Sequence, residues 1–219
     1  MLTKDNHLPE NSVIPGRLST IEEARDYDTT RFTRRYRMKR LDRFEKAFAQ
    51  RLLDMTGEQA RILDIPCGNG RFFNIFSKAK KLTMADYSEN MLQAAEEKFG
   101  ATENLELIQA DISSIPLADN SVDLCFCMRL FHHMKNDRVR LKALKELARV
   151  SGRYIALSFY NKSCLRFYWR KTLGKKIRGN YITADHIVSL AEQAGLELVS
   201  RIPKINLNEQ QCLLILKKA

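Results

Sequence analysis

The chain has 219 residues, a usual size for one structural domain with a large core. No stretch approaches the roughly 20 apolar residues of a transmembrane helix, and residues 1–12 lack the apolar core of a signal peptide. The chain has 37 lysines and arginines against 26 acidic residues, and the formal net charge of +11 favours an acidic partner: an anionic small molecule, a membrane surface or a nucleic acid. We expect a cytoplasmic protein, either free in solution or peripheral to the inner face of a membrane.

The cysteines are scattered and mostly lie in apolar surroundings. Cys125 and Cys127 would share one face of a strand, but a single Cys-x-Cys pair is a poor zinc signal. We therefore expect no metal site, and we expect every cysteine to be a reduced, small hydrophobic residue. They are Cys67, Cys125, Cys127, Cys164 and Cys212.

The N-terminal quarter is predicted to be an arm followed by helices. Residues 1–20 contain prolines and a glycine among polar residues and are typical of an irregular arm. Residues 21–55 have apolar side chains every three to five positions, which predicts helical structure with one apolar stripe. The other faces form either a solvated surface or one that binds anions or a membrane. Their cations are Arg31, Arg34, Arg35, Arg37, Lys39, Arg40 and Arg43.

A short apolar run, Ile62–Ile65, breaks at a proline into a turn that contains Gly68 and Gly70. This order predicts a buried parallel strand, a tight turn and a helix at 71–79. Glycine permits positive φ and has no Cβ, so we expect both glycines to let the backbone approach a cofactor. Phe73 stands where a dinucleotide fold would have its third glycine, and the turn has no Gly-Lys-Ser/Thr ending. The turn therefore favours a nucleoside-like ligand without a pyrophosphate.

Residues 63–70, Leu-Asp-Ile-Pro-Cys-Gly-Asn-Gly, resemble the first motif of class I S-adenosylmethionine-dependent methyltransferases of the type 11-like group. Four further stretches in the expected order extend the resemblance to the C-terminus. It implies an α/β fold: a doubly wound, mostly parallel, seven-stranded sheet with helices on both faces and a closing antiparallel hairpin. It also implies that residues 56–219 form the core, that residues 1–55 supply lid helices, and that S-adenosyl-L-methionine is the cofactor. The implied cofactor-binding residues of this motif are Asp64, Pro66, Cys67, Gly68 and Gly70.

Asp86 follows the strand predicted at 82–85. A carboxylate at a strand end can accept hydrogen bonds from both ribose hydroxyls. The alternative is an acid at the N-terminus of the helix predicted at 89–98. The position of Asp86 after the strand favours ribose binding, which would place Tyr87 beside the adenine.

A third strand is predicted at 105–109. The resemblance implies that Asp111 reaches the exocyclic amine of adenine and that Ile112 packs on the ring. The alternative for Asp111 is an ordinary turn acid.

The strand predicted at 124–128 is followed by Arg-Leu-Phe-His-His-Met. Its carboxyl end should bring Met128 to the cofactor and Arg129 to the substrate, at the rim of the crevice. Either His132 or His133 is a candidate for acid–base catalysis or substrate orientation. The alternative is that both histidines are structural.

Residues 161–180 follow the strand predicted at 154–159 and contain seven cations, three consecutive aromatic residues and no acid. The family commonly has substrate-specific insertions here, so we predict a substrate lid or a surface on which an anionic substrate or membrane docks. The alternative is a solvated basic loop. Together with Arg129, the predicted substrate-binding residues are Tyr36, Arg166, Tyr168 and Arg170, and Tyr27 is a further candidate for the lid.

The remaining elements are predicted from periodicity and turn signals. Helices are expected at 138–150 and 183–194, the second with Thr183 as N-cap and Gly195 as its stop. Two strands at 196–202 and 211–216 should close the sheet.

The resemblance implies methyl transfer to oxygen, carbon or nitrogen of a small-molecule or lipid-linked acceptor, and the basic charge favours an anionic one. Base-amine methylators often have an Asn/Asp-Pro-Pro-Tyr/Phe stretch after the fourth strand, where this chain has Cys-Met-Arg-Leu. Other RNA-modifying chemistry remains an alternative. So do a catalytically silent cofactor-binding regulator and a membrane- or nucleic-acid-binding scaffold.

Overall fold

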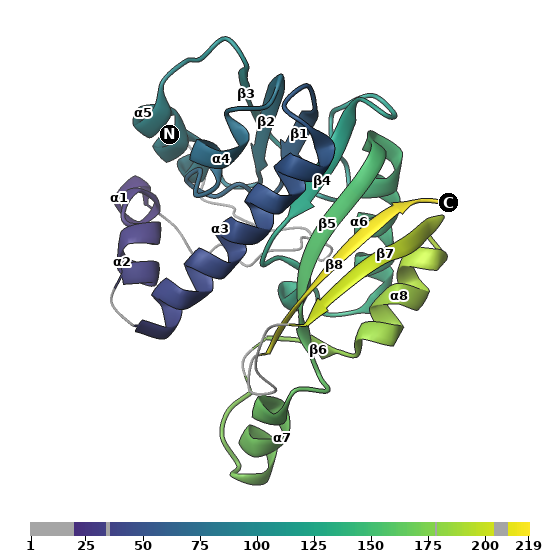
Figure 1. The fold of residues 1–219 in the computed structure, drawn as a ribbon. Coiled ribbons are helices and arrows are strands. Elements are labelled where there is room, and N and C mark those ends of the chain that lie inside the picture. Colours follow the sequence, from purple (N-terminus) through teal and green to yellow (C-terminus); the bar gives the residue numbers. More distant parts are fainter. Residues whose placement is uncertain (1–19, 34–35, 178, 204–209) are drawn as a thin grey trace, which may run out of the picture.

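The computed structural model describes residues 20–33, 36–177, 179–203 and 210–219, and these form one mixed sheet with helices on both faces (Figure 1). The strand order is β3-β2-β1-β4-β5-β8-β7, and the short β6 pairs with β5 beside this path. The first five strands run parallel, and β8 is antiparallel to both β5 and β7. The strands are β1 (Arg61–Asp64), β2 (Lys81–Asp86), β3 (Leu105–Gln109), β4 (Val122–Cys127), β5 (Ser151–Asn161), β6 (Tyr181–Ile182), β7 (Leu196–Pro203) and β8 (Gln211–Lys218).

The doubly wound fold and its antiparallel closing hairpin are confirmed, and β6 adds an eighth strand that the sequence pattern did not predict. Residues 204–209, between the closing strands, lie outside the described part. The helices are α1 (Ile21–Arg25), α2 (Tyr27–Thr33), α3 (Tyr36–Thr56), α4 (Phe73–Phe76), α5 (Glu89–Phe99), α6 (Asp137–Val150), α7 (Leu165–Thr172), α8 (Ala184–Glu192) and the 3₁₀ turn η1 (Phe131–His133).

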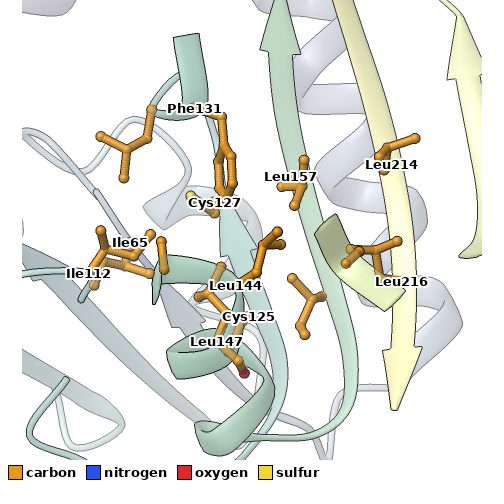
Figure 2. Close-up of a cluster of buried hydrophobic side chains, with 14 of the residues drawn as sticks. Ile65, Ile112, Cys125, Cys127, Phe131, Leu144, Leu147, Leu157, Leu214 and Leu216 are labelled. Atoms are coloured by element: carbon orange, nitrogen blue, oxygen red, sulfur yellow. The ribbon is translucent and has the colours of Figure 1, made fainter. Parts of the chain in front are cut away.

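Alternate residues of the central strands point to opposite faces, as expected for strands buried on both sides. Leu63 and Cys125 pack with Leu144 of α6 and Leu190 of α8 in one hydrophobic core. Figure 2 shows a part of this core, including Cys125 and Cys127 beside α6. The other core contains Ile62 and Leu124 together with side chains of α3, α4 and α5. Each fully buried aliphatic side chain contributes about 1.5–3 kcal/mol, so these two cores hold the strand ends in fixed positions.

The helical predictions are confirmed at 21–55 and differ from the structure in two other places. Residues 21–55 are helical as predicted and contain the three helices α1, α2 and α3, while Arg34 and Arg35 lie outside the described residues. The predicted helix at 71–79 is reduced to α4, because Arg71 and Phe72 remain in the turn. The segment 161–180 contains α7, where no helix was predicted.

The other local predictions are close to the structure. Thr183 caps α8 by accepting a hydrogen bond from the backbone N–H of His186, and Gly195 has φ +75° two residues beyond the C-cap. The five cysteines are buried free thiols, as predicted. Among the described residues, no helix combines the length and apolar character needed to span a bilayer.

Candidate cofactor and acceptor site

The carboxyl ends of the parallel strands bring the predicted cofactor residues to one edge of the sheet. A small hollow that is open to solvent lies at this edge, lined by mostly apolar side chains and one acid. The geometry therefore places the predicted adenine residues around one space. Its lining residues are Ile65, Pro66, Tyr87, Ala110, Asp111, Ile112 and Leu130.

Asp86 lies between this hollow and the glycine turn. Its side chain is buried and accepts hydrogen bonds from the backbone N–H groups of Gly68 and Ser88, both at 2.9 Å. Burial raises the pKa of the Asp86 carboxyl, while these hydrogen bonds oppose the rise. Asp86 is not the N-cap of α5, because Ser88 takes that place by accepting from the N–H of Met91. A carboxylate has about four acceptor positions, so Asp86 retains capacity for further donors.

The two glycines of the turn have different surroundings. Gly68 has φ +58°, and nothing lies within 4 Å of the position where a Cβ would be, so the backbone is open to a ligand. Gly70 has φ +82°, but its Cβ would lie 2.3 Å from Cε2 of Phe99, a ring that stacks on Phe73 at 4.0 Å. The missing Cβ of Gly70 therefore makes room for Phe99 of α5, and the predicted approach of a cofactor to the Gly70 backbone stays a prediction.

Asp64, at the end of β1, is buried with no hydrogen-bond partner on either carboxylate oxygen among the described residues. Burial raises its pKa well above the usual range, although the positive charge of Arg71 opposes this. An unpaired buried carboxyl is costly, so a donor brought by a ligand would be favourable here. Cys67 and Met128 were also predicted to bind the cofactor. Both are buried and pack in the core that contains Ile62, Leu124 and side chains of α3.

A buried ion network ties the glycine turn to α3 and β8, and sequence analysis missed it. Glu45 of α3 is fully buried and accepts hydrogen bonds from Arg71 and from Gln211, each at 2.6 Å. Arg71 also donates to Asp42 at 2.9 Å. One signal was present in the sequence: Glu45 occupies a helical position of the apolar stripe, between Leu41 and Phe48.

The network continues into a group of cations on the acceptor side. Arg129 has φ +63°, lies over the ring of Phe32, and places Nη1 at 3.6 Å from Glu45. Its Nε and Nη1 are buried without a hydrogen bond among the described groups. Arg31 of α2 donates to the hydroxyl of Tyr27, and its pKa is lowered by burial and by the charge of Arg129. The guanidinium groups of Arg31 and Arg129, which come from separate elements, thus lie near each other in a largely buried region.

His132 lies in the same neighbourhood. Its ring is buried and stacks on Tyr160 at 3.9 Å, and its Nδ1 has no hydrogen-bond partner among the described residues. Burial, with the nearby charges of His133, Arg129 and Arg31, lowers the pKa of His132 to about 2. The imidazole is therefore neutral at physiological pH. The ring of His133 is 4.1 Å from that of His132, but its side chain is exposed.

The N-terminal helices cover the glycine turn. The amide of Asn69 is buried and donates to the backbone oxygen of Ala24 at 3.0 Å, which fixes α1 over the turn. Tyr27 packs against a small cluster formed by Ala24, Met91 and Ala94. Asn69 was not predicted as a site residue, because its neighbours in the sequence give no sign of this contact.

The other predicted substrate residues do not line the hollow. Tyr36 is 76% exposed at the start of α3. Arg166, Tyr168 and Arg170 lie on α7, which projects from the end of the sheet where β5 terminates (Figure 1). The segment that follows α7 returns to the site, where the backbone N–H of Asn180 donates to the backbone oxygen of His132 at 2.8 Å.

Residues 62–152 match a sequence model of the family described as a methyltransferase domain. A demethylmenaquinone methyltransferase of Staphylococcus aureus (strain JH9) is 33% identical over 111 residues, covering 48% of this chain and 45% of the relative. The chain thus spans less than half the length of the curated relatives it matches.

Solved structures share the fold over most of the chain. Magnesium protoporphyrin IX methyltransferase from Synechocystis PCC 6803, with bound SAH, has a TM-score of 0.73 at 16% identity, over 90% of this chain and 97% of that one. A SAM-dependent methyltransferase from Aquifex aeolicus has a TM-score of 0.61 at 20% identity, over 91% of this chain and 97% of that one.

Proposed function

We propose that this chain, which contains a class I S-adenosylmethionine-dependent methyltransferase domain, transfers the methyl group of S-adenosyl-L-methionine to an anionic small-molecule or lipid-linked acceptor. The acceptor is met in solution or at an anionic membrane surface. The observation that carries the proposal is the grouping of Asp64, Gly68, Asp86 and the apolar hollow at one sheet edge. Residues 56–219 would form the catalytic core, residues 1–55 its cover, and residues 161–180 an insertion on the substrate side.

The residues present fit this cofactor. The remaining acceptor positions of Asp86 suit the ribose hydroxyls, and the hollow beside Tyr87 and Ile112 suits the adenine ring. Asp64 has two buried oxygens without partners, and an ammonium group such as that of a methionine moiety would satisfy them. The open space at Gly68 lets the backbone approach the same moiety.

The cofactor supplies a methyl group already activated by a sulfonium, so the chain has to align the acceptor and exclude water. His132 is a weak base because of its lowered pKa, and we assign it the role of a hydrogen-bonding group that orients the acceptor. His132 is therefore not assigned the role of a general base. An acceptor that arrives already deprotonated needs no base, and the N–H groups of Arg129 that make no hydrogen bond among the described residues match its negative charge.

The names of the relatives support a small acceptor. One is a demethylmenaquinone methyltransferase and another a magnesium protoporphyrin IX methyltransferase, so similar chains or folds serve small molecules. The net charge of +11 is the observation that favours the second candidate, an RNA-modifying methyltransferase. A catalytically silent regulator would retain the cofactor site without turnover.

Incubating the purified chain with a cell extract and S-adenosylmethionine labelled in the methyl group distinguishes these functions. The proposal expects label in the organic-solvent extract or in the small-molecule fraction. Label in RNA would support the second candidate. Cofactor binding without label in any fraction would favour the silent regulator, and absence of cofactor binding would overturn the proposal.

A further inference from the structure

Helix α7 presents an apolar surface to solvent. Trp169 is 71% exposed, and none of the eight residues of the helix is buried. At about 100° per residue, the four large apolar side chains of this surface fall within an arc of about 140°. We call them the α7 stripe: Leu165, Tyr168, Trp169 and Leu173, the last directly after the helix.

Cations border the α7 stripe. Arg166 and Arg170 follow it on one side of the helix and Lys171 on the other, and Lys175 and Lys176 come after Leu173 and Gly174. Residues 161–180 contain no acid that could neutralise them. An apolar stripe between cations is the pattern of helices that lie in the interface of an anionic bilayer.

The opposite side of α7 attaches it to the protein. Phe167 contacts the ring of Tyr181 at 5.0 Å, and Cys164, just before the helix, is buried. Asn180 then binds the backbone of His132. The stripe therefore lies on the side of α7 opposite to Phe167, and α7 itself projects beyond the end of the sheet (Figure 1).

We infer that α7 is a membrane-docking helix, whose stripe enters the interface of an anionic lipid bilayer while the surrounding cations bind the lipid headgroups. Charge complementarity selects this occupant, because a second copy of this chain would bring another group of cations to the stripe. The consequence that the acceptor reaches the site from the bilayer rests on the proposed function; the docking itself does not.

Trp169 makes the inference directly testable, because it is the single tryptophan of the chain. With vesicles of phosphatidylcholine and phosphatidylglycerol, its emission should shift to shorter wavelength and be quenched by lipids with brominated acyl chains. High salt should reduce the binding, and vesicles of phosphatidylcholine alone should bind more weakly. Unchanged emission with both kinds of vesicle would overturn the inference. So would a shift produced by single-stranded RNA and not by vesicles, which would identify a nucleic-acid surface.

Matched variants separate the two parts of the surface. The double variant Leu165→Ser with Leu173→Ser should abolish quenching by brominated lipid, whereas Leu198→Ser with Val199→Ser, at exposed apolar residues of β7, should not. Changing Lys171, Lys175 and Lys176 to glutamine should weaken vesicle binding at least about tenfold. The same change at the exposed Lys135, Lys142 and Lys145 lowers the net charge equally and should weaken vesicle binding less. Equal losses in a variant and its control would contradict the inference.

Calorimetry with S-adenosylmethionine keeps the two proposals apart. All four variants should bind the cofactor like the wild type, since none touches the hollow. Vesicle binding without cofactor binding would remove the proposed function and leave the docking helix. Cofactor binding and methyl transfer without vesicle binding would support the proposed function and overturn the docking helix.

Discussion

The two halves of the site are built in different ways. On the cofactor side, Asp64, Gly68 and Asp86 lie at or just after two neighbouring strand ends, and backbone N–H groups of Gly68 and Ser88 position the Asp86 carboxylate. On the acceptor side, Arg31, Glu45 and Arg129 come from α2, α3 and the segment after β4. The first half depends on local backbone geometry, whereas the second depends on packing between distant segments. Substitutions should therefore affect the two halves differently.

The largest effect is expected from the buried network of the acceptor side. Glu45→Gln removes the charge that pairs with Arg71 and Arg129 in a fully buried position. Loss of one partner of such a pair should lower the free energy of unfolding by about 3–5 kcal/mol. Asp42→Asn breaks the more exposed pair with the same arginine and should cost about 1 kcal/mol. Urea denaturation measures both, and equal costs would show that burial of Glu45 does not matter.

The two glycines give the next largest difference. Gly70→Ala adds a Cβ against Phe99 at positive φ and should lower the free energy of unfolding by about 2–4 kcal/mol. Gly68→Ala has the unfavourable φ alone and should cost about 1–2 kcal/mol. Thermal and urea unfolding of the pair checks this. If Gly68→Ala proved the more destabilising, the roles assigned to the two glycines would be reversed.

On the cofactor side, Asp86→Ala should weaken S-adenosylmethionine binding more than tenfold, by about 1.5–3 kcal/mol, because hydrogen bonds to a charged acceptor are lost. Asp54→Ala, at an exposed acid of α3, is the control and should leave the affinity unchanged. Calorimetry on the folded variants decides. An unchanged dissociation constant for Asp86→Ala would remove Asp86 from the cofactor site.

Asp64 should show a conflict between stability and binding. Burial raises the pKa of the Asp64 carboxyl in the folded chain, whereas its pKa in the unfolded chain is about 3.9. Between these two pKa values the folded state binds more protons than the unfolded state. The free energy of unfolding therefore falls as the pH rises through this range. Asp64→Asn should therefore stabilise the cofactor-free protein at neutral pH, with a gain that disappears as the pH falls toward about 4. The same variant should bind the cofactor less tightly. A gain that is equal at both pH values would contradict the assigned cause.

The smallest effect is expected for the pH dependence of His132. An ordinary histidine base would lose activity below about pH 6.5, whereas His132 has its pKa lowered to about 2 and should stay neutral. The nuclear magnetic resonance shifts of its imidazole should therefore not change between neutral and mildly acidic pH. A titration of this ring near the ordinary value would restore the role of general base.

Local patterns predicted most of the fold, and the residues predicted to bind adenine line one hollow at the sheet edge. The third strand was predicted at 105–109 and is found there, and the closing hairpin follows from two apolar runs. The helix predicted at 71–79 is limited to Phe73–Phe76, and Arg71, in the turn before it, uses its side chain in the network with α3. That network joins Glu45 to Gln211, 166 residues away, and no local pattern predicts such a pair. Helix α7 was not predicted. Its apolar residues are exposed and do not pack on the core, whereas the helices predicted from apolar periodicity have an apolar face that does.

A crystal structure with S-adenosylhomocysteine would test the central claim most directly. The ribose hydroxyls should lie within hydrogen-bond distance of the Asp86 carboxylate, with the adenine in the hollow beside Ile112 and the ammonium group near Asp64. The space beyond the sulfur should open toward Arg129 and His132. Adenine bound elsewhere, or a ribose out of reach of Asp86, would contradict the assignment of this sheet edge as the cofactor site.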